Sequence, residues 1–392
     1  MLGNAESGDP AWTVVNKPSL LYVCPVIPAV TGNGLAMRAG MVLEALADSC
    51  RVSLLLVPMF GAVDAKMSEH FRRKCEHVVT VPFHTDTQRR IQEAGAAYSG
   101  SSFDIIHVFR LVTVPFARPY FTNAEGRARR YLDLDDIESK THRRIAALCR
   151  ITGNTALAES EEAESRRAAF LEGAAVRMFD RIYVCSETDR NELSERSRAD
   201  VVVLRNVVRL PETVPPPNSA RPFRFLFLGT LGYYPNADAV RYFCREVLPL
   251  IPQSATDFVV DIVGEGRCEG LQELASDVVH LVGPVPEVRP WYERCYALIV
   301  PIRAAGGTRI KILEAFSYGR PVITTSVGVE GLDAISGTHL LVADTPEDFA
   351  AACLRLMSDR SLAEMLVENA RELLHRSYTS DRLKESIAAL IQ

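Results

Sequence analysis

The sequence predicts an α/β protein built from two doubly wound domains. Short apolar, β-branched runs alternate with helical patterns from residue 19 to residue 206, which is typical of parallel strands buried on both faces. A polar, proline-rich stretch at 209–222 interrupts this alternation, which resumes at residue 223. A chain of 392 residues is too long for one compact hydrophobic core and is long enough for two domains. We therefore expect two domains facing each other across a cleft, with ligands beyond the carboxyl ends of the strands.

The expected elements follow the chain in order. In the first half the strands are 19–27, 51–58, 77–83, 103–109, 129–135, 181–186 and 201–206, and helices cover 33–47, 64–74 and 86–97. In the second half the strands are 223–229, 258–264, 277–283, 296–302, 321–325 and 338–343, and helices cover 236–248, 308–318, 346–357, 361–374 and 381–391. The expected domains are 19–208 and 223–378, joined by the linker 209–222. A final helix in 379–392 can cross back to the first domain.

Composition and charge narrow the class of protein. The formal net charge is −5 and neither half carries a basic excess, so we expect no nucleic-acid partner. The nine cysteines are odd in number and never form a Cys-x-x-Cys pair, which indicates reduced thiols rather than a disulfide framework. The first eighteen residues do not resemble a signal peptide, and no run of about 18 apolar residues occurs, which favours a cytoplasmic protein.

Three basic clusters leave a membrane contact open. They are Arg72 to Lys74, Arg89 with Arg90, and Arg127 to Arg130, and each could touch an anionic lipid surface. Solvated helix faces explain such runs more often. The expected location is therefore cytoplasmic, with peripheral contact to the inner membrane face as the alternative left open.

The most informative segment is the strand, loop and helix within 296–325. The strand runs into Gly306 and Gly307, and a helix is expected to begin near Thr308, which is a candidate N-cap. The two glycines let backbone N–H groups approach an anion at the positive end of the helix. Lys311 and Glu314 lie one turn apart on this otherwise apolar helix. They are either an exposed ion pair or contacts of a charged ligand, and the glycine loop favours the ligand.

Several segments, taken in order along 19–378, resemble the retaining GT-B glycosyltransferases of family 4. The segment ending in Glu-Ala-x-x-x-Gly-x-Pro-Val at 314–322 is similar to the donor-binding motif of that family. The other similar segments are TGNG at 31–34, FDIIHVF at 103–109, YVCSETD at 183–189, LRNVV at 204–208, FLGTLGYYPNADAV at 227–240, DIVGEG at 261–266, LVGPVPEV at 281–288 and VGVEGL at 327–332.

This resemblance implies two Rossmann-like domains, with a nucleotide sugar in the second and the acceptor in the first. It puts Glu314 on the ribose hydroxyls, the amides of Gly307 and Thr308 on the sugar and diphosphate, and Val285 near the base. The donor-binding residues it implies are Gly34, Thr230, Gly232, Val285, Gly306, Gly307, Thr308 and Glu314. The donor would be linked to UDP, GDP or dTDP, and the acceptor would be a small molecule, a glycan or a lipid-linked group.

Three positions depart from the family pattern. The Glu that commonly stands eight positions before the ribose-binding Glu is Gly306 here, and the usual diphosphate-binding Arg and Lys fall on Thr230 and Pro235. We expect Arg309 and Lys311 to restore the two positive charges. The third departure is a first-domain His that an acidic cluster replaces.

The acidic cluster Asp133, Asp135 and Asp136 follows a first-domain strand. Asp136 is either an N-cap of the next helix or a carboxylate that positions the acceptor hydroxyl or stabilises positive charge on the sugar ring. Metal ligation by Asp135 and Asp136 has weak support, and we expect no metal and no cofactor besides the donor. The predicted catalytic residues are Arg309, Lys311, Asp135 and Asp136.

Three other features receive structural interpretations. Gly264 and Gly266 form half of a dinucleotide fingerprint without its spacing, so NAD binding has weak support. His107 is more simply a packed strand residue than a catalytic one, and Asn236 is a candidate helix cap.

The function that these observations predict is transfer of a sugar from a nucleotide donor to an acceptor hydroxyl with retention, without a metal. A nucleotide-sugar epimerase on the same fold and a catalytically inactive GT-B binding module are the alternatives, and an NAD-dependent oxidoreductase is the weakest one.

Overall fold

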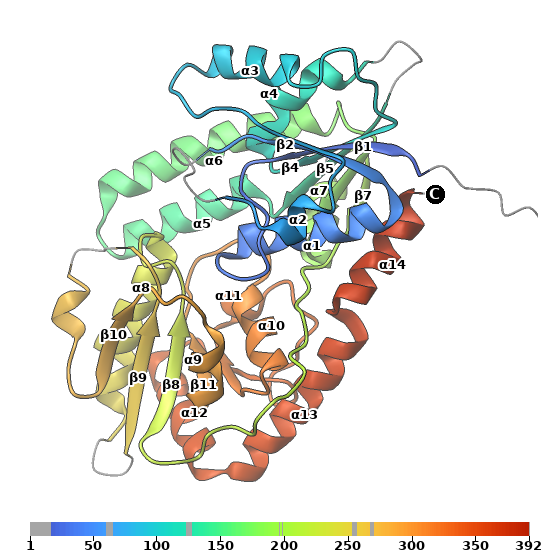
Figure 1. The fold of residues 1–392 in the computed structure, drawn as a ribbon. Helices are drawn as coiled ribbons and strands as arrows, with labels where there is room; N and C mark the ends of the chain where they lie inside the picture. Colours follow the sequence, from blue (N-terminus) through green and yellow to red (C-terminus); the bar gives the residue numbers. More distant parts are fainter. Residues whose placement is uncertain are drawn as a thin grey trace, which may run out of the picture.

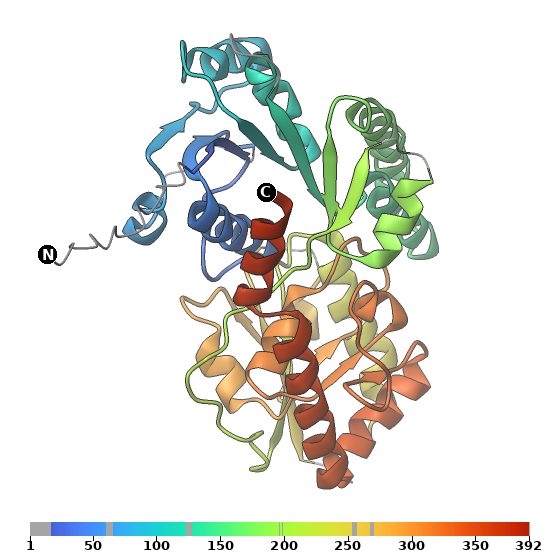
Figure 2. The ribbon, with the colours of Figure 1, turned by 90° about the vertical axis from the view of Figure 1, so that its right-hand side faces the viewer.

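The computed structural model describes residues 17–59, 66–122, 128–195, 197, 199–252, 257–266 and 270–391. Within these residues the chain forms two separate sheets whose strand pairs are all parallel, one above the other in Figure 1. Helices lie on both faces of the sheets (Figure 2). The prediction of two doubly wound α/β domains is confirmed.

The first sheet has seven strands in the order β3-β2-β1-β4-β5-β6-β7. The strands are β1 (Ser19–Cys24), β2 (Arg51–Leu56), β3 (His77–Thr80), β4 (Ile105–Phe109), β5 (Arg129–Asp135), β6 (Arg181–Val184) and β7 (Asp200–Val203). The helices of this part are α1 (Gly34–Ser49), α2 (Glu69–Arg72), α3 (Thr87–Ala96), α4 (Val114–Ala117), α5 (Glu138–Ile151), α6 (Thr155–Ala175) and α7 (Glu187–Ser194).

The second sheet has six strands in the order β10-β9-β8-β11-β12-β13. The strands are β8 (Phe223–Leu228), β9 (Phe258–Val263), β10 (Val279–Gly283), β11 (Ala297–Val300), β12 (Val322–Thr324) and β13 (Leu341–Val342). The helices are α8 (Tyr234–Tyr242), α9 (Arg289–Arg294), α10 (Ile310–Ser317), α11 (Ser326–Val329), α12 (Pro346–Ser358), α13 (Arg360–Ser377) and α14 (Ser380–Ile391). The strand order reverses between β1 and β4 and between β8 and β11, and such switch points open crevices for ligands.

Continuous burial explains why the strands could be found from apolar runs. All residues of β4 and of β9 are buried, and so are five of the six residues in β1 and in β2. A strand covered by helices on both faces has no solvent side, so its sequence does not alternate between apolar and polar residues.

Two expected helices differ from those observed. The helix expected over 64–74 is only α2, and residues 60–65 lie outside the described part of the chain. The helix expected over 236–248 begins at Tyr234 and changes to a π turn at Phe243–Val247. The N-cap of α8 is Tyr233, so the prediction of Asn236 as the cap is wrong. Pro235 fits the first turn of α8 because that position needs no N–H donor.

Helix α14 returns from the second domain to the first. It lies against α1, and Figure 2 shows the two helices side by side. Lys384 forms an ion pair with Asp48 of α1 at 2.8 Å, and Arg129 and Arg181 donate to the carbonyls of Ile391 and Leu390 at 2.9 and 2.8 Å. The linker is tied to the second domain, because Arg320 donates to the carbonyls of Pro215 and Pro216.

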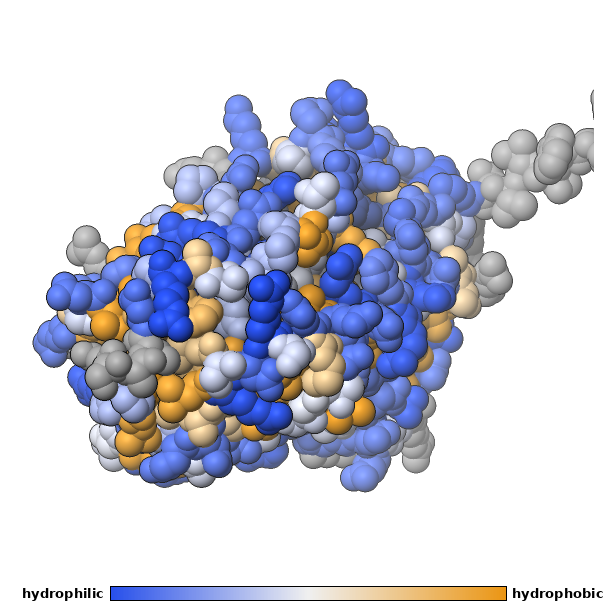
Figure 3. Space-filling model, turned by 90° about the horizontal axis from the view of Figure 1, so that it is seen from below, coloured by the Kyte–Doolittle hydropathy of each residue, from blue (hydrophilic) through white to orange (hydrophobic). Residues whose placement is uncertain are grey.

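Of the basic clusters considered for membrane contact, Arg72, Arg73 and Arg89 are exposed, whereas Arg90 and Arg130 are engaged within the protein. Arg90 is buried over the rings of Phe83 and Phe116, and Arg130 forms an ion pair with Asp180. Arg127 lies outside the described residues. No helix in the described part of the chain is long and apolar enough to cross a bilayer. Seen from below, hydrophobic residues form separate small groups among hydrophilic ones (Figure 3).

Candidate functional site

The candidate site lies where the carboxyl ends of the two sheets approach each other. The Asn206 amide, which follows β7, donates to the Thr308 hydroxyl after β11 at 2.8 Å. A Cβ added to Gly34, at the start of α1, would lie 3.2 Å from Ile310 Cδ1 at the start of α10. The loops predicted to bind the donor therefore contact the first domain directly.

The two glycines of the loop after β11 are needed for different reasons. Gly307 has a φ of 62°, which is the left-handed region that favours glycine. Gly306 has no such φ, but a Cβ there would overlap the Thr141 hydroxyl and the Asp136 carboxylate. The backbone requires Gly307, whereas the first domain excludes a side chain at Gly306.

Helix α10 begins later than the sequence predicts. Its first residue is Ile310, its N-cap is Arg309, and no side chain caps it. The prediction of Thr308 as the cap is therefore wrong, because the Thr308 hydroxyl is turned toward Asn206. The Arg309 guanidinium is buried and donates back to the Gly307 carbonyl. This contact brings a positive charge over the glycine loop.

Lys311 projects from the first turn of α10 toward the start of α8. Its Nζ donates to Asn236 Oδ1 at 3.1 Å and lies 4.8 Å from the centre of the Phe227 ring. Burial, together with the smaller effect of the neighbouring Arg309 charge, lowers the pKa of Lys311 to about 7 against the opposing effect of Glu314. A bound anion would restore the charged form of this lysine.

Glu314 lies beside a stacked pair of tyrosines. Tyr292 donates to Glu314 Oε2 at 3.4 Å and stacks on Tyr318 with 4.8 Å between ring centres. Burial raises the pKa of Glu314 to about 7. Both residues are described, and no ion pair joins Lys311 to Glu314, so the exposed-pair interpretation is wrong. The helix is too buried for the two side chains to meet in solvent, and each finds another partner.

The other predicted donor residues line the same edge of the second sheet. Gly232 is exposed, the Thr230 carbonyl accepts from Asn236 at 3.0 Å, and Val285 is half-buried in the loop after β10. A Cβ at Gly266 would lie 2.5 Å from the Gly232 nitrogen. The glycines after β9 thus allow two loop backbones to approach closely.

In the first domain, two residues at neighbouring strand ends have unusual backbones. Arg110 after β4 has a φ of 71°, and Asp135 at the end of β5 has a φ of 64°. Non-glycine residues in this region cost free energy and cluster at functional sites. Arg110 forms ion pairs with Asp136, with Asp135 at 3.7 Å and with Glu138 at 3.0 Å. The strained strand ends therefore hold a compact charged cluster.

The two predicted catalytic carboxylates of this cluster have opposite pKa shifts. Burial opposes ionisation of Asp136, but the Arg110 charge and the Thr141 hydroxyl, at 2.7 Å, outweigh it and hold the pKa below its usual range. Burial raises the pKa of Asp135, and the Asp136 charge adds to this effect against Arg38. Asp136 is therefore the ionised member, and Asp135 takes up a proton more readily.

The alternative of Asp136 as a helix cap is wrong. Helix α5 begins at Glu138, its N-cap is Ile137, and no side chain caps it. The Asp136 carboxylate is instead turned toward Arg110 and Thr141.

Asp133 and His107 are structural neighbours of this cluster. Asp133 is buried in an ion pair with Arg38 at 2.8 Å. His107 is buried between the rings of Tyr22 and Tyr183, and burial lowers its pKa to about 3. A neutral, packed His107 agrees with the structural interpretation made from the sequence.

Residues absent from the predicted set join the two halves of the site. Besides Asn206 and Thr141, an ion-pair group links the domains: Lys140 bonds Asp189 at 3.0 Å and Glu330 at 2.9 Å, and Arg144 bonds Glu330 at 2.7 Å. Asn206 and Glu330 lie in the segments LRNVV and VGVEGL, which the sequence had marked. Nothing in the sequence pointed to Thr141 or Lys140.

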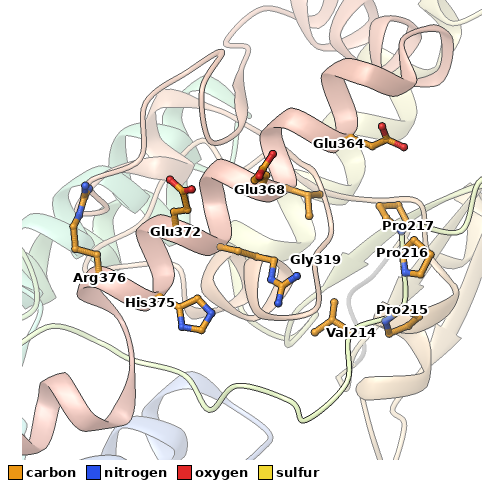
Figure 4. A pocket seen from close by; sticks show the side chains of 12 residues that line it. Val214, Pro215, Pro216, Pro217, Gly319, Glu364, Glu368, Glu372, His375 and Arg376 are labelled. Carbon is orange, nitrogen blue, oxygen red and sulfur yellow. The ribbon is translucent and has the colours of Figure 1, made fainter.

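Two cavities lie away from these residues. One, of about 920 Å³, runs between the linker prolines and α13 and includes Glu364, Glu368 and His375 (Figure 4). The other, of about 570 Å³, lies between the α5–α6 turn and α8. None of the predicted site residues lines either of these two cavities. Among the described residues, no three His, Cys, Asp or Glu side chains are grouped as a metal site.

Comparison with solved structures shows that this arrangement is the GT-B fold. Sucrose-phosphate synthase from Thermosynechococcus elongatus is similar with a TM-score of 0.73 and 16% identity, over 96% of this chain and 98% of that chain. HepE from Anabaena, in complex with UDP and glucose, has a TM-score of 0.69 and 14% identity, over 95% and 99% of the two chains. TarM from S. aureus, in a complex that includes UDP, has a TM-score of 0.69 and 10% identity, over 96% and 100%.

Sequence comparison adds information on the second domain. Residues 222–359 match the family described as "Glycosyl transferases group 1". A protein of Klebsiella pneumoniae, described as an uncharacterized 44.6 kDa protein in the cps region, is 24% identical over 171 residues. That match spans 41% of this chain and 44% of the length of the Klebsiella protein. The matched family segment contains the glycine loop, Lys311 and Glu314.

Proposed function

We propose that this chain is a glycosyltransferase that moves a sugar from a nucleotide sugar to an acceptor hydroxyl, with retention and without a metal. The observation that carries the proposal is the position of Lys311 and Glu314. They lie on the helix that opens at the glycine loop, inside the segment that matches group 1 glycosyl transferases, and this glycine loop packs against Asp136 of the first domain.

The chemistry fits the charges at this edge. The bond between the anomeric carbon and the phosphate oxygen breaks, and its electron pair leaves with the nucleoside diphosphate. The acceptor oxygen bonds to the anomeric carbon on the same face, and its proton passes to the departing phosphate oxygen. Arg309, Lys311 and the start of α10 stabilise the charge that grows on the diphosphate.

The donor and acceptor are assigned by the chemistry of each domain. Glu314 would bind the ribose hydroxyls, and Gly34, Thr230, Gly232, Gly306, Gly307, Thr308 and Val285 would surround the sugar, diphosphate and base. HepE and TarM were solved with UDP, which supports UDP-linked donors as the first to test, before GDP- and dTDP-linked ones. Asp135 and Asp136 would lie on the first-domain side of the transferred sugar, where the acceptor, a small molecule, a glycan or a lipid-linked group, would approach.

A panel of UDP-, GDP- and dTDP-linked sugars tests this proposal. A transferase releases nucleoside diphosphate from one donor, and proton NMR of the glycoside should show the anomeric configuration of the donor. An epimerase would produce an isomeric nucleotide sugar without free diphosphate. An inactive module would bind a donor, detected by calorimetry, and consume none. Either result would replace the transferase proposal.

We also propose a cytoplasmic location with peripheral membrane contact through the C-terminal half of α6. Phe170 is 77% exposed, and Leu171 is exposed beside it. The exposed charges nearby are Arg166, Arg167 and Arg177 together with two acids, Glu164, which pairs with Arg167, and Asp180, which pairs with Arg130. Glu172 is buried and accepts from Ser139. Exposed apolar side chains among arginines suit an anionic lipid surface.

A further inference from the structure

The space beside Gly306 is filled from the other domain. Residue 306 is Gly where the family pattern commonly has Glu. Its φ does not lie in the left-handed region, so its backbone would accept a side chain. The Thr141 hydroxyl and the Asp136 carboxylate occupy the volume that a Cβ would need. At the next residue, a Cβ on Gly307 would lie 3.1 Å from Asp136 Cβ and 3.5 Å from Cys185 Sγ. The glycine loop therefore packs directly against Asp136.

The surroundings keep this carboxylate charged and oriented. Arg110 and Thr141 hold it from the first domain, and Arg309 adds a positive charge from the second. Of the neighbouring acids, Glu138 shares Arg110 with Asp136, Asp135 pairs with Arg38 at 3.5 Å, and Glu330 pairs with Lys140 and Arg144. Asp136 is thus the ionised group that the first domain directs at the glycine loop.

The location of the loop indicates what this carboxylate would meet. The diphosphate belongs at the start of α10, near Lys311 and Arg309, if the proposed function holds. The transferred sugar is attached to the outer phosphate, so it would extend from α10 toward Gly306, Gly307 and the first domain. A carboxylate there can accept a hydrogen bond from a sugar hydroxyl and stabilise positive charge as the glycosidic bond breaks.

We propose that Asp136 is the carboxylate that contacts the transferred sugar, supplied by the first domain at the position where residue 306 carries none. This inference rests on the proposed function and adds one requirement to it. The donor loop is completed by a residue of the other domain, so the sugar site is complete only when the two domains are in contact.

The first test compares two acids that share Arg110. With the nucleotide sugar that the wild-type protein turns over fastest, Asp136→Asn should lower turnover about 100-fold, the scale of losing one preorganised electrostatic contact. Affinity for the nucleoside diphosphate, which has no sugar, should change less than about twofold. The matched control Glu138→Gln removes an acid from the same arginine and should lower turnover less than about threefold.

The second test moves the carboxylate to the loop. Gly306→Glu alone should abolish turnover, because its side chain meets Asp136 and Thr141. Combined with Asp136→Gly and Thr141→Ala, which clear that space, Gly306→Glu should recover at least about tenfold over the variant that keeps Gly306. If the combined variant does not fold, formate added to Asp136→Ala serves the same purpose, since a free carboxylate can enter the vacated space and should raise turnover.

The outcomes separate this inference from the proposed function. A wild-type protein that turns over no nucleotide sugar overturns both. An active wild type whose Asp136→Asn variant keeps turnover within threefold overturns only the role of Asp136. The role of Asp136 is also overturned if the combined variant folds but does not recover turnover, or if formate does not raise the turnover of Asp136→Ala. Equal losses of turnover and diphosphate affinity in Asp136→Asn, with a lower melting temperature, would mean that Asp136 only joins the domains.

Discussion

The ammonium of Lys311 predicts how the binding of a nucleoside diphosphate depends on pH. Its pKa is lowered to about 7, so the free protein loses this charge above that pH. A bound diphosphate favours the charged form, and the affinity for UDP should fall by about tenfold per pH unit above 7. Calorimetry between about pH 6 and pH 9 measures this slope. Lys311→Arg stays charged and should flatten it, whereas an unchanged slope would assign the titration to another group.

Above about pH 7, Glu314 should lower the stability of the ligand-free protein, and it should strengthen the binding of the nucleotide. Its pKa is raised to about 7 by burial, so the unfolded chain loses this proton at lower pH than the folded protein does. Its contribution to stability is present at low pH and is lost as the pH rises toward 7. At about pH 8, Glu314→Gln should therefore raise the melting temperature of the ligand-free protein. The same change should weaken nucleotide binding by about 1 to 3 kcal/mol.

Thermal melting and calorimetry of the same Glu314→Gln sample test both effects, the higher melting temperature and the weaker nucleotide affinity. A lower melting temperature with unchanged affinity would make Glu314 a structural residue held by Tyr292. The matched variant Tyr292→Phe removes the hydrogen bonds of this hydroxyl to Glu314 and to the Lys311 carbonyl, and it should retain the stacking on Tyr318.

At the scale of elements, α5 holds the second domain through Glu330. Lys140 and Arg144 both pair with this residue, and Arg144 also donates to the Ala305 carbonyl at 3.0 Å. Glu330→Gln should release part of this contact, and the ligand-free radius of gyration should rise above the roughly 21 Å expected for a compact chain of this length. Small-angle scattering measures the change, and added salt should reproduce it by screening.

The matched control for this prediction is Arg167→Gln, which removes an exposed pair with Glu164 within α6. It should leave the scattering curve unchanged. A Glu330→Gln curve identical to that of the wild type would show that Asn206, Arg144 and the packing of α14 on α1 are sufficient to hold the domains.

At the scale of the whole molecule, the exposed face of α6 predicts lipid binding. Flotation with vesicles containing phosphatidylglycerol should recover the wild-type protein, whereas vesicles of phosphatidylcholine alone should not. Phe170→Ser with Leu171→Ser should reduce recovery by about tenfold or more. Ile151→Ser is the matched control, since Ile151 is also 77% exposed but lies at the other end of the α5–α6 pair. Equal recovery of both variants would exclude this face.

The sequence by itself determined the architecture, because parallel strands are buried along their whole length and their apolar runs are local. The strand-loop-helix segment carrying Gly306 and Glu314 was also found, since glycines after a strand and charges on an apolar helix need no distant neighbour to be noticed. The roles of these residues in donor binding stay predictions.

Only the tertiary structure decided which hydrogen-bond or ion-pair partner each polar side chain has. Thr308 and Asn236 were candidate helix caps, and capping was one of the two interpretations of Asp136. Each instead bonds a residue far along the chain: Thr308 bonds Asn206, Asn236 bonds Lys311 and Asp136 bonds Arg110. A cap needs only a neighbouring backbone N–H, so the sequence favours it by default. A charged or amide partner that folding brings close can form a stronger hydrogen bond than the backbone N–H does. The local sequence pattern does not predict which distant residue this partner will be. The same reason explains Gly306, because Thr141 and Asp136 of the first domain occupy the volume that its side chain would need.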